Sequence, residues 1–182
     1  MPEATMEAAP KSTAMSVQDT LRDLAGKVRY TVDVNTKGIS HADSLKQPQP
    51  AGNCSNWVLG HLLVIYTKTL PMLGEQSVIG MDRLGHYDRG SAPIIDAGDA
   101  IVFDELLAAW NTSCDRFDAG LSRVSDEMLL QPVADSPTGN PNETVHSLLF
   151  TLMFHQTYHS GQLGLLRRVA GMEGAITQPS VS

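Results

Sequence analysis

Two histidines near the C-terminal end of the chain, His155 and His159, are four residues apart. In an α-helix four residues turn through about 400°, so the two imidazoles would lie about 40° apart on one face. Side chains at this spacing can bind one divalent metal ion together, as the i, i+4 histidines of zinc enzymes do. Leu148 and Leu166 fall within about 20° of His155 on the same helix, which predicts that this face points into the protein.

The pair alone leaves two interpretations open, because a histidine on an apolar face is more often a hydrogen-bonded core residue than a metal ligand. A third histidine, His61, favours the metal. It interrupts the apolar run from Trp57 to Ile65, and burying an unpaired imidazole there would cost about 1–3 kcal/mol. An ion shared with the other helix would satisfy the ring. We therefore expect His61, His155 and His159 to bind one divalent ion.

Three neutral imidazoles would leave the ion its full charge and at least one open coordination position, which is typical of catalytic rather than structural sites. An ion held in this way lowers the pKa of a bound water or thiol. Gln156 follows the first histidine of the pair where His-Glu-x-x-His peptidases have a glutamate. Because an amide is no base, peptide hydrolysis of that kind is disfavoured.

Helices must position these histidines, and the apolar periodicity predicts four. They run from Ser16 to near Gly38, from about Ser55 to Leu70, from near Asp99 past Leu121, and from Pro141 to about Val169, the last capped by Asn140 with Glu143 at its third position. With no strand pattern present, we predict an all-α four-helix bundle. The link from Gly74 to Gly98 is long enough to be a crossover, which would let helices two and three run in the same direction.

Composition limits the remaining possibilities. The 182 residues suit one domain, with residues 16–170 in the bundle and residues 1–15 and 171–182 as a flexible leader and tail. The net charge of −7 and the lack of a basic cluster exclude nucleic acid as a partner. The apolar runs are too short for a membrane span and no signal peptide is seen, so we expect a cytoplasmic protein.

Two sequence elements resemble a known family. The segment Asn56–Leu62, with its Gly-His-Leu element, and the segment His155–Gln162 are similar to those of the DinB/YfiT-like family of metal-dependent proteins. The likeness spans roughly Ser16 to Val169. It implies an up-down-down-up four-helix bundle, frequently a homodimer, whose three histidines bind nickel, zinc or a similar divalent ion. Those ligands correspond to the histidine triad predicted above.

Members of this family include transferases that use low-molecular-weight thiols, such as bacillithiol or mycothiol, and a mycothiol-dependent maleylpyruvate isomerase. The resemblance therefore implies an enzyme that transfers a small thiol to an electrophilic small molecule. The alternative is a non-catalytic, stress-responsive metal-binding dimer. An open coordination position in a pocket beside the long link would favour the enzyme, whereas a fourth protein ligand, or no cavity beside the ion, would favour the alternative.

Gln162 and Tyr158 are the candidate catalytic residues beside the metal ligands. Gln162 lies near His159 on the same face, where it would hold a metal-bound water or a ligand oxygen, or else be a buried amide bonded to the backbone. Tyr158 would donate to substrate, or else pack in the core with its hydroxyl at the rim.

The remaining histidines and the cysteines are weaker candidates. His146 lies about 180° from His155 on the helix and cannot join the site. His86, in the long link, would cover the metal or lie on the surface, and His41 is most simply a surface residue. Cys54 begins a helix, too far along the axis from the triad to be a ligand, and Cys114 belongs to an apolar stripe.

Overall fold

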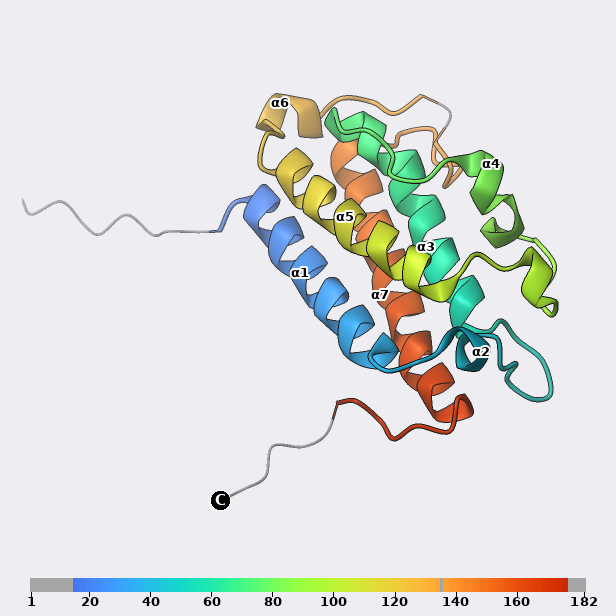
Figure 1. Ribbon diagram of the computed structural model, residues 1–182. Coiled ribbons are helices and arrows are strands. Elements are labelled where there is room, and N and C mark those ends of the chain that lie inside the picture. The colour runs from blue at the N-terminus through green and yellow to red at the C-terminus, as the bar shows by residue number, and fades with distance from the viewer. Residues whose placement is uncertain (1–14, 135, 177–182) are drawn as a thin grey trace, which may run out of the picture.

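The computed structural model describes residues 15–134 and 136–176, and within these ranges the protein is all-α and contains no strands. Four long helices pack side by side (Figure 1). They are α1 (Val17–Thr36), α3 (Ser55–Thr69), α5 (Phe103–Leu121) and α7 (Val145–Val169). The predicted leader and tail, residues 1–15 and 171–182, lie largely outside the described residues and stay predictions.

Shorter elements connect the long helices. They are α2 (His41–Ser44), α4 (Met81–Leu84), α6 (Asp126–Leu129) and the 3₁₀ turns η1 (Leu70–Leu73), η2 (Gly85–Tyr87) and η3 (Ala97–Asp99). None of the helices in the described part of the chain is long and apolar enough to cross a membrane.

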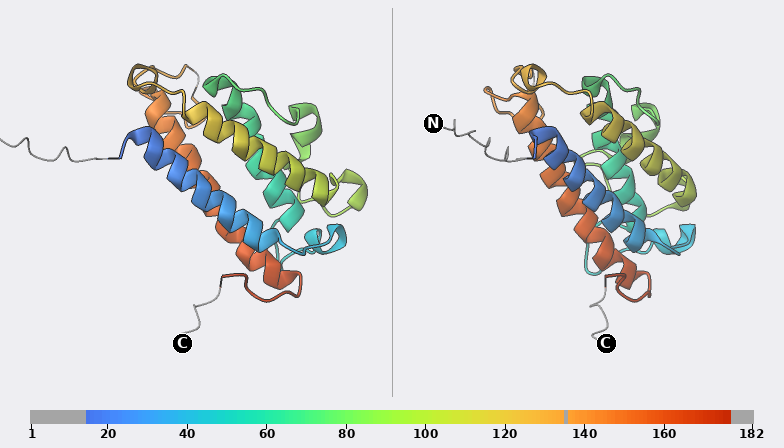
Figure 2. Two further views of the ribbon diagram at one scale, coloured as in Figure 1. Left: turned by 60° about the vertical axis from the view of Figure 1, so that its left-hand side comes forward. Right: turned by 90° about the vertical axis from the view of Figure 1, so that its left-hand side faces the viewer.

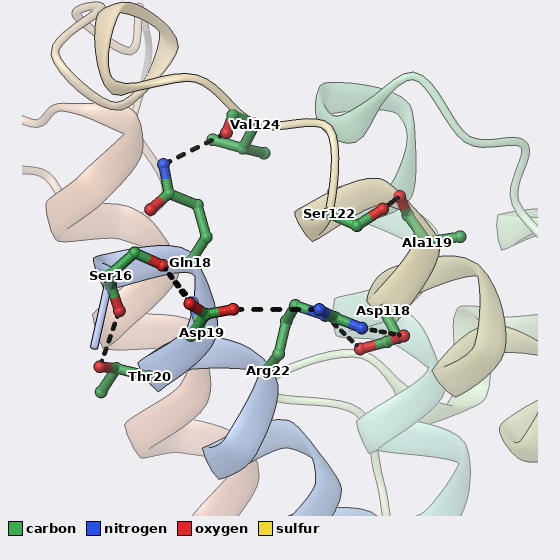
Figure 3. Close-up of polar contacts among 9 residues, drawn as sticks. All are labelled: Ser16, Gln18, Asp19, Thr20, Arg22, Asp118, Ala119, Ser122 and Val124. Atoms are coloured by element: carbon green, nitrogen blue, oxygen red, sulfur yellow. Dashed lines mark hydrogen bonds and ion pairs between the residues drawn. The ribbon is translucent and has the colours of Figure 1, made fainter. Parts of the chain in front are cut away.

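Helix α1 begins where the sequence predicts. The hydroxyl of Ser16 accepts a hydrogen bond from the backbone N–H of Asp19 at 3.0 Å, which caps the helix. Arg22 ties this part of the helix to α5, and Figure 3 shows its two parallel bonds to Asp118, of 2.7 and 3.0 Å. The apolar face of the helix points inward, where Leu21, Val28 and Val32 are buried and Val17 and Leu24 are partly buried. α1 therefore packs its apolar face against α7 and α5.

Helix α5 begins four residues later than predicted. Residues 97–99 form the separate turn η3, capped by the carboxylate of Asp96, and the helix starts at Phe103. The backbone N–H of Ile101 is bonded to the hydroxyl of Tyr87, which holds the chain before Phe103 out of the helix. From Phe103 to Leu121 the apolar positions are buried as the periodicity predicts.

The predicted cap of α7 is wrong. The helix starts at Val145, and Thr144 and Ser147 form its capping box. Asn140 instead accepts a bond from the N–H of Asn142 within a turn. Two backbone hydrogen bonds join the chain at the start of the helix to residues 131–133. The buried carboxylate of Glu143 also holds this segment, because it accepts hydrogen bonds from the hydroxyls of Thr138 and Ser147. These contacts take the backbone groups that an earlier helix start would need.

The end of α7 agrees with the sequence. The helix closes at Ala170, and Gly171 takes the left-handed conformation, with φ of 88°, that favours glycine at this position.

Helix α3 is buried on nearly all sides. It packs against α5 and α7, and the link that carries α4 and η2 lies over it on the side away from α1 (Figure 2). This surrounding explains why α3 is apolar around its whole circumference. His61, in the middle of this helix, is therefore held in the interior.

Candidate metal site

The structure brings the three predicted histidines together. His61 comes from the middle of α3, and His155 and His159 come from successive turns of α7. One ring nitrogen from each lies within 4.8 Å of the others, and the Nε2 atoms of His61 and His155 are 3.2 Å apart. His61 is buried, and the other two rings are half-buried. The three rings therefore lie together, the pair on α7 as its spacing predicts and His61 as its place in an apolar helix predicts.

The orientation of His61 is set from two sides. Its Nδ1–H donates to the main-chain carbonyl of Tyr87 at 2.7 Å, so the ring carries its lone pair on Nε2 and presents it to His155. The indole of Trp57 stacks on the same ring, with centroids 4.7 Å apart and planes 16° apart. The indole N–H donates to the carbonyl of His86, which ties the link to α3. The second ring nitrogen is therefore held ready for a ligand.

A buried hydrogen-bond cluster holds Tyr87 in place. Its hydroxyl donates to the side-chain oxygen of Asn56 and accepts from the backbone N–H of Ile101, both at 2.8 Å. Asn56 closes the cluster by donating to the carbonyl of Ile101 at 2.9 Å. Gly60 permits this packing, because a Cβ at Gly60 would lie 2.0 Å from the Tyr87 ring. The link is thereby pinned against the helix that carries His61.

Sequence reasoning missed these supporting residues. Asn56 and Gly60 lie within the element Asn56–Leu62 that carries the family resemblance, so a signal for them existed. Tyr87 gives no comparable signal, because its role depends on the path of the link across α3.

The side chain of Gln162 contacts His159 and does not point to a free coordination position of the ion. Its Oε1 accepts a hydrogen bond from Nδ1–H of His159 at 2.7 Å, which leaves Nε2 of that ring for a ligand. Neither of the two interpretations from the sequence, a hold on a bound water or a bond to the backbone, describes this contact. Gln162 is thus placed to fix the tautomer of His159.

Tyr158 lies at the surface beside the triad. Its side chain is 61% exposed, so the alternative that it packs in the core is wrong. Its ring meets the ring of His159 edge-on, with centroids 5.1 Å apart. The residue is therefore near enough to the site to contact a bound small molecule.

The environment keeps the triad neutral. Burial lowers the pKa of all three imidazoles below the ordinary value of about 6.5. The effect is largest for His155, where burial, then the neighbouring imidazoles, and then the Arg89 guanidinium lower the pKa to about 4. Near neutral pH all three rings are uncharged and have lone pairs to donate.

The donor set fits a divalent ion. Two ring nitrogens 3.2 Å apart need a proton or a cation between them. Metal–nitrogen bonds of about 2.0–2.1 Å in tetrahedral geometry place neighbouring ligand nitrogens roughly 3.3 Å apart. The Nδ1 atom of His155 is buried and has no partner among the described residues, so nothing there competes for the ring. Imidazole nitrogens suit zinc, nickel, copper and iron.

Within residues 15–134 and 136–176 no fourth His, Cys, Asp or Glu side chain joins the triad, and these three histidines are the one group of three or more such side chains placed to hold an ion. A three-histidine set leaves coordination positions for water or substrate, which is the catalytic pattern.

His41, His86 and the two cysteines lie outside the triad. His41 accepts a hydrogen bond from the N–H of Phe103 at 3.3 Å, at the start of α5. His86 is exposed, as the surface interpretation predicts. Cys54 is buried at the N-cap position of α3. Burial raises the pKa of Cys114 to about 12, so that thiol is protonated and unreactive.

Two open surface pockets lie elsewhere. One, of about 400 Å³, lies between residues 78–83 of the link and α5. The other, of about 470 Å³, lies between the end of α1 and α5. No triad residue lines either pocket, so neither provides a binding site directly beside the three histidines.

Comparisons with known proteins agree with the helical fold and with the chemistry of the site. The sequence model of a family described as mycothiol-S-transferase matches residues 3–171. Among solved structures, the chain is similar to the crystal structure of a conserved protein from Enterococcus faecalis. The TM-score is 0.66 and the identity 15%, and the match covers 86% of this chain and 98% of that one. At this identity the likeness concerns the fold alone. A comparison with curated proteins found no match.

Proposed function

Because this chain belongs to the mycothiol-S-transferase family, we propose that it is a metal-dependent enzyme that transfers the low-molecular-weight thiol mycothiol to an electrophilic small molecule. The observation that carries the proposal is the convergence of three neutral imidazoles without a fourth side-chain ligand in the described part of the chain. A site of this composition leaves a coordination position that a thiol sulfur would take.

In this proposal His61, His155 and His159 hold one divalent ion, nickel or zinc. Bound there, the ion would supply the Lewis acidity that lowers the pKa of a thiol to near neutrality. The carbonyl of Tyr87 and the amide oxygen of Gln162 each bind the far nitrogen of a ligand ring. Contacts of this kind fix the tautomer and direction of metal-binding imidazoles.

The reaction is a substitution or addition at an electrophilic atom. The S–H bond of the thiol breaks and its proton passes to solvent; the sulfur electron pair forms the new bond, and any leaving group departs with its own pair. Arg89, which contributes positive charge near His155, would favour the thiolate over the thiol. The exposed hydroxyl of Tyr158, beside His159, would donate to the electrophile or its leaving group.

The proposal extends to the architecture. We propose that the bundle is of the up-down-down-up type, with residues 16–170 as one folding unit. This is supported by Figure 1, in which α5 begins near the end of the bundle where α3 begins, and by the packing of α3 on α5. The long link then returns the chain along the outside of α3. A cytoplasmic location remains part of this proposal.

A homodimer is the assembly that we propose, with α7 at its centre. Large apolar side chains are exposed along one face of this helix: Phe150, Phe154, Leu165 and Val169. Their spacing forms a stripe, and a stripe of this kind can be buried against its own copy about a twofold axis.

Metal analysis tests the proposed function. The protein is purified without chelators or a histidine tag, and wild type is compared with His61→Ala and His159→Ala. We expect about one ion per chain in wild type and its loss in both variants, with helicity by circular dichroism retained.

Thiol consumption is then followed with mycothiol and a panel of electrophiles. We expect turnover that depends on the ion and is lost in His155→Ala. Stoichiometric metal without turnover for any thiol would support the alternative, a non-catalytic metal-binding bundle.

A further inference from the structure

Gln156 lies at the level of the metal site without being one of its ligands. It follows His155 directly in α7 and is fully buried. Its Nε2 donates to the main-chain carbonyl of Leu62 at 3.2 Å. Leu62 follows His61 directly in α3. This hydrogen bond therefore joins α7 to α3 through residues that are each adjacent in sequence to a predicted metal ligand.

A second buried polar group on α3, the hydroxyl of Tyr66, lies near the same amide. The Oε1 atom of Gln156 and the hydroxyl of Tyr66 are both buried, and neither has a partner within hydrogen-bond criteria among the described residues. Tyr66 lies four residues after Leu62, which is one helical turn. Burial raises the pKa of Tyr66 well above its ordinary value, and contacts with the side chains of Cys114 and Gln156 have smaller effects on it, so the hydroxyl lies near both side chains.

An acceptor and a donor that are both buried and partnerless on facing helices are complementary. A small side-chain rotation, or one buried water, would join the Gln156 oxygen to the Tyr66 hydroxyl. The amide would then hold two points on successive turns of α3. Two points define both how far apart the helices stand and how far α7 is rotated about its own axis.

We propose that Gln156 is a positioning residue that sets the spacing and rotation of α7 against α3, and thereby the approach of the His155 ring to the His61 ring. This inference rests on the metal site of the proposed function. It also accounts for an amide at this position. A carboxylate has no hydrogen to donate to the Leu62 carbonyl, and an apolar side chain would serve neither contact.

The test is the variant Gln156→Met, which has similar length and no hydrogen-bonding amide. The affinities for Zn²⁺ and Co²⁺ are measured by competition with a chelator, and the visible absorption spectrum of the Co²⁺-loaded protein reports the ligand geometry. We expect the affinity to fall about 10–100-fold, as for other partners that orient ligands. We also expect a changed Co²⁺ spectrum, with helicity retained.

The matched control is Leu149→Ala. Leu149 is fully buried in α7, six residues before His155 and without a polar contact to lose. It should lower stability at least as much as Gln156→Met but leave the Co²⁺ spectrum and the metal affinity of the folded protein unchanged. Equal losses of affinity in the two variants would show that Gln156 acts only through general stability, which overturns the inference.

The contact with Tyr66 is tested without metal. The variants Gln156→Met and Tyr66→Phe and their double variant are unfolded with urea after chelation. We expect non-additive effects, because each single change breaks the same contact.

Additive effects would show that Gln156 and Tyr66 do not interact. If Gln156→Met keeps the wild-type metal affinity and an unchanged Co²⁺ spectrum, the positioning role is refuted while the proposed metal site stands. If wild type itself binds no ion, both the proposed function and this inference are refuted.

Discussion

The close approach of Gly60 to Tyr87 allows a prediction about a single methyl group. An added Cβ would lie 2.0 Å from Cδ1 of the Tyr87 ring and 2.5 Å from its Cγ and Cε1. Non-bonded carbons are normally about 3.5–4.0 Å apart, so the ring would have to move by roughly 1.5 Å. It cannot rotate aside freely, because it is fully buried and two hydrogen bonds hold its hydroxyl.

The expected cost of Gly60→Ala follows from opposing effects. Overpacking a core costs about 1–3 kcal/mol, and loss of a Tyr87 hydrogen bond adds about 0.5–1.5 kcal/mol. Replacing glycine by alanine within a helix returns about 0.5–1 kcal/mol. The free energy of unfolding should therefore fall by about 2 kcal/mol, within a range of about 0.5–4 kcal/mol. Because the Tyr87 carbonyl would also leave Nδ1 of His61, metal affinity should fall about 10–100-fold.

The measurements are urea unfolding of the metal-free protein and Zn²⁺ competition with a chelator. Gly161→Ala is the control, because Gly161 lies in α7 beside the triad and a Cβ there would meet no atom within 4 Å. This variant should be as stable as wild type or more stable by up to about 1 kcal/mol, with unchanged metal affinity. If Gly60→Ala behaves like this control, the account of how the link orients His61 is wrong.

Four further predictions follow from individual contacts. Tyr87→Phe leaves two buried polar partners unsatisfied and should lower the free energy of unfolding by about 1–3 kcal/mol in urea melts; a change near zero would contradict the buried cluster. Lowering the pH should destabilise the metal-free protein. A histidine in the unfolded chain takes up a proton near pH 6.5, whereas His155 in the folded protein does so only near pH 4. Between these two pH values the unfolded state binds more protons, so acid favours unfolding. We expect a loss on the order of 1–2 kcal/mol between pH 7 and pH 4, allowing for solvent screening, and a flat profile in urea melts would count against buried neutral rings. Gln162→Ala should weaken Zn²⁺ binding about tenfold with little change in the thermal melt, because it removes the acceptor that orients one ligand ring; unchanged affinity would leave this contact without a role. Thr144→Ala should cost about 1 kcal/mol in thermal or urea unfolding and Asn140→Ala much less, and the reverse order would restore the earlier helix start.

The helices and the triad were accessible from the sequence because their evidence is local. A repeat of apolar residues every three to four positions specifies which face of α1 or α5 is buried, whatever lies opposite. The spacing of His155 and His159 specifies a shared face by helix geometry alone. His61 was recognisable because a lone imidazole in an apolar helix must be satisfied by something.

The errors occurred where contacts from distant segments decide the outcome. Asn140 is a residue type that often caps helices. However, backbone hydrogen bonds between the segment just before Val145 and residues 131–133 delay the start of α7 to Val145. In the same way, a bond from Ile101 to a hydroxyl in the link delays α5. Propensity describes what a segment can do alone, and hydrogen bonds to other segments override it.

The sequence by itself determined an all-α chain and the shared face of His155 and His159, since both depend on the period of a helix. It also identified His61 as a buried imidazole that needs a partner. Only the tertiary structure decided how those imidazoles are oriented. The carbonyl that holds His61 comes from Tyr87 in a link that folds back over α3, and Gln156 reaches a carbonyl on the facing helix. Which donor meets which acceptor across helices depends on how the helices pack, and no pattern along the chain encodes that distance.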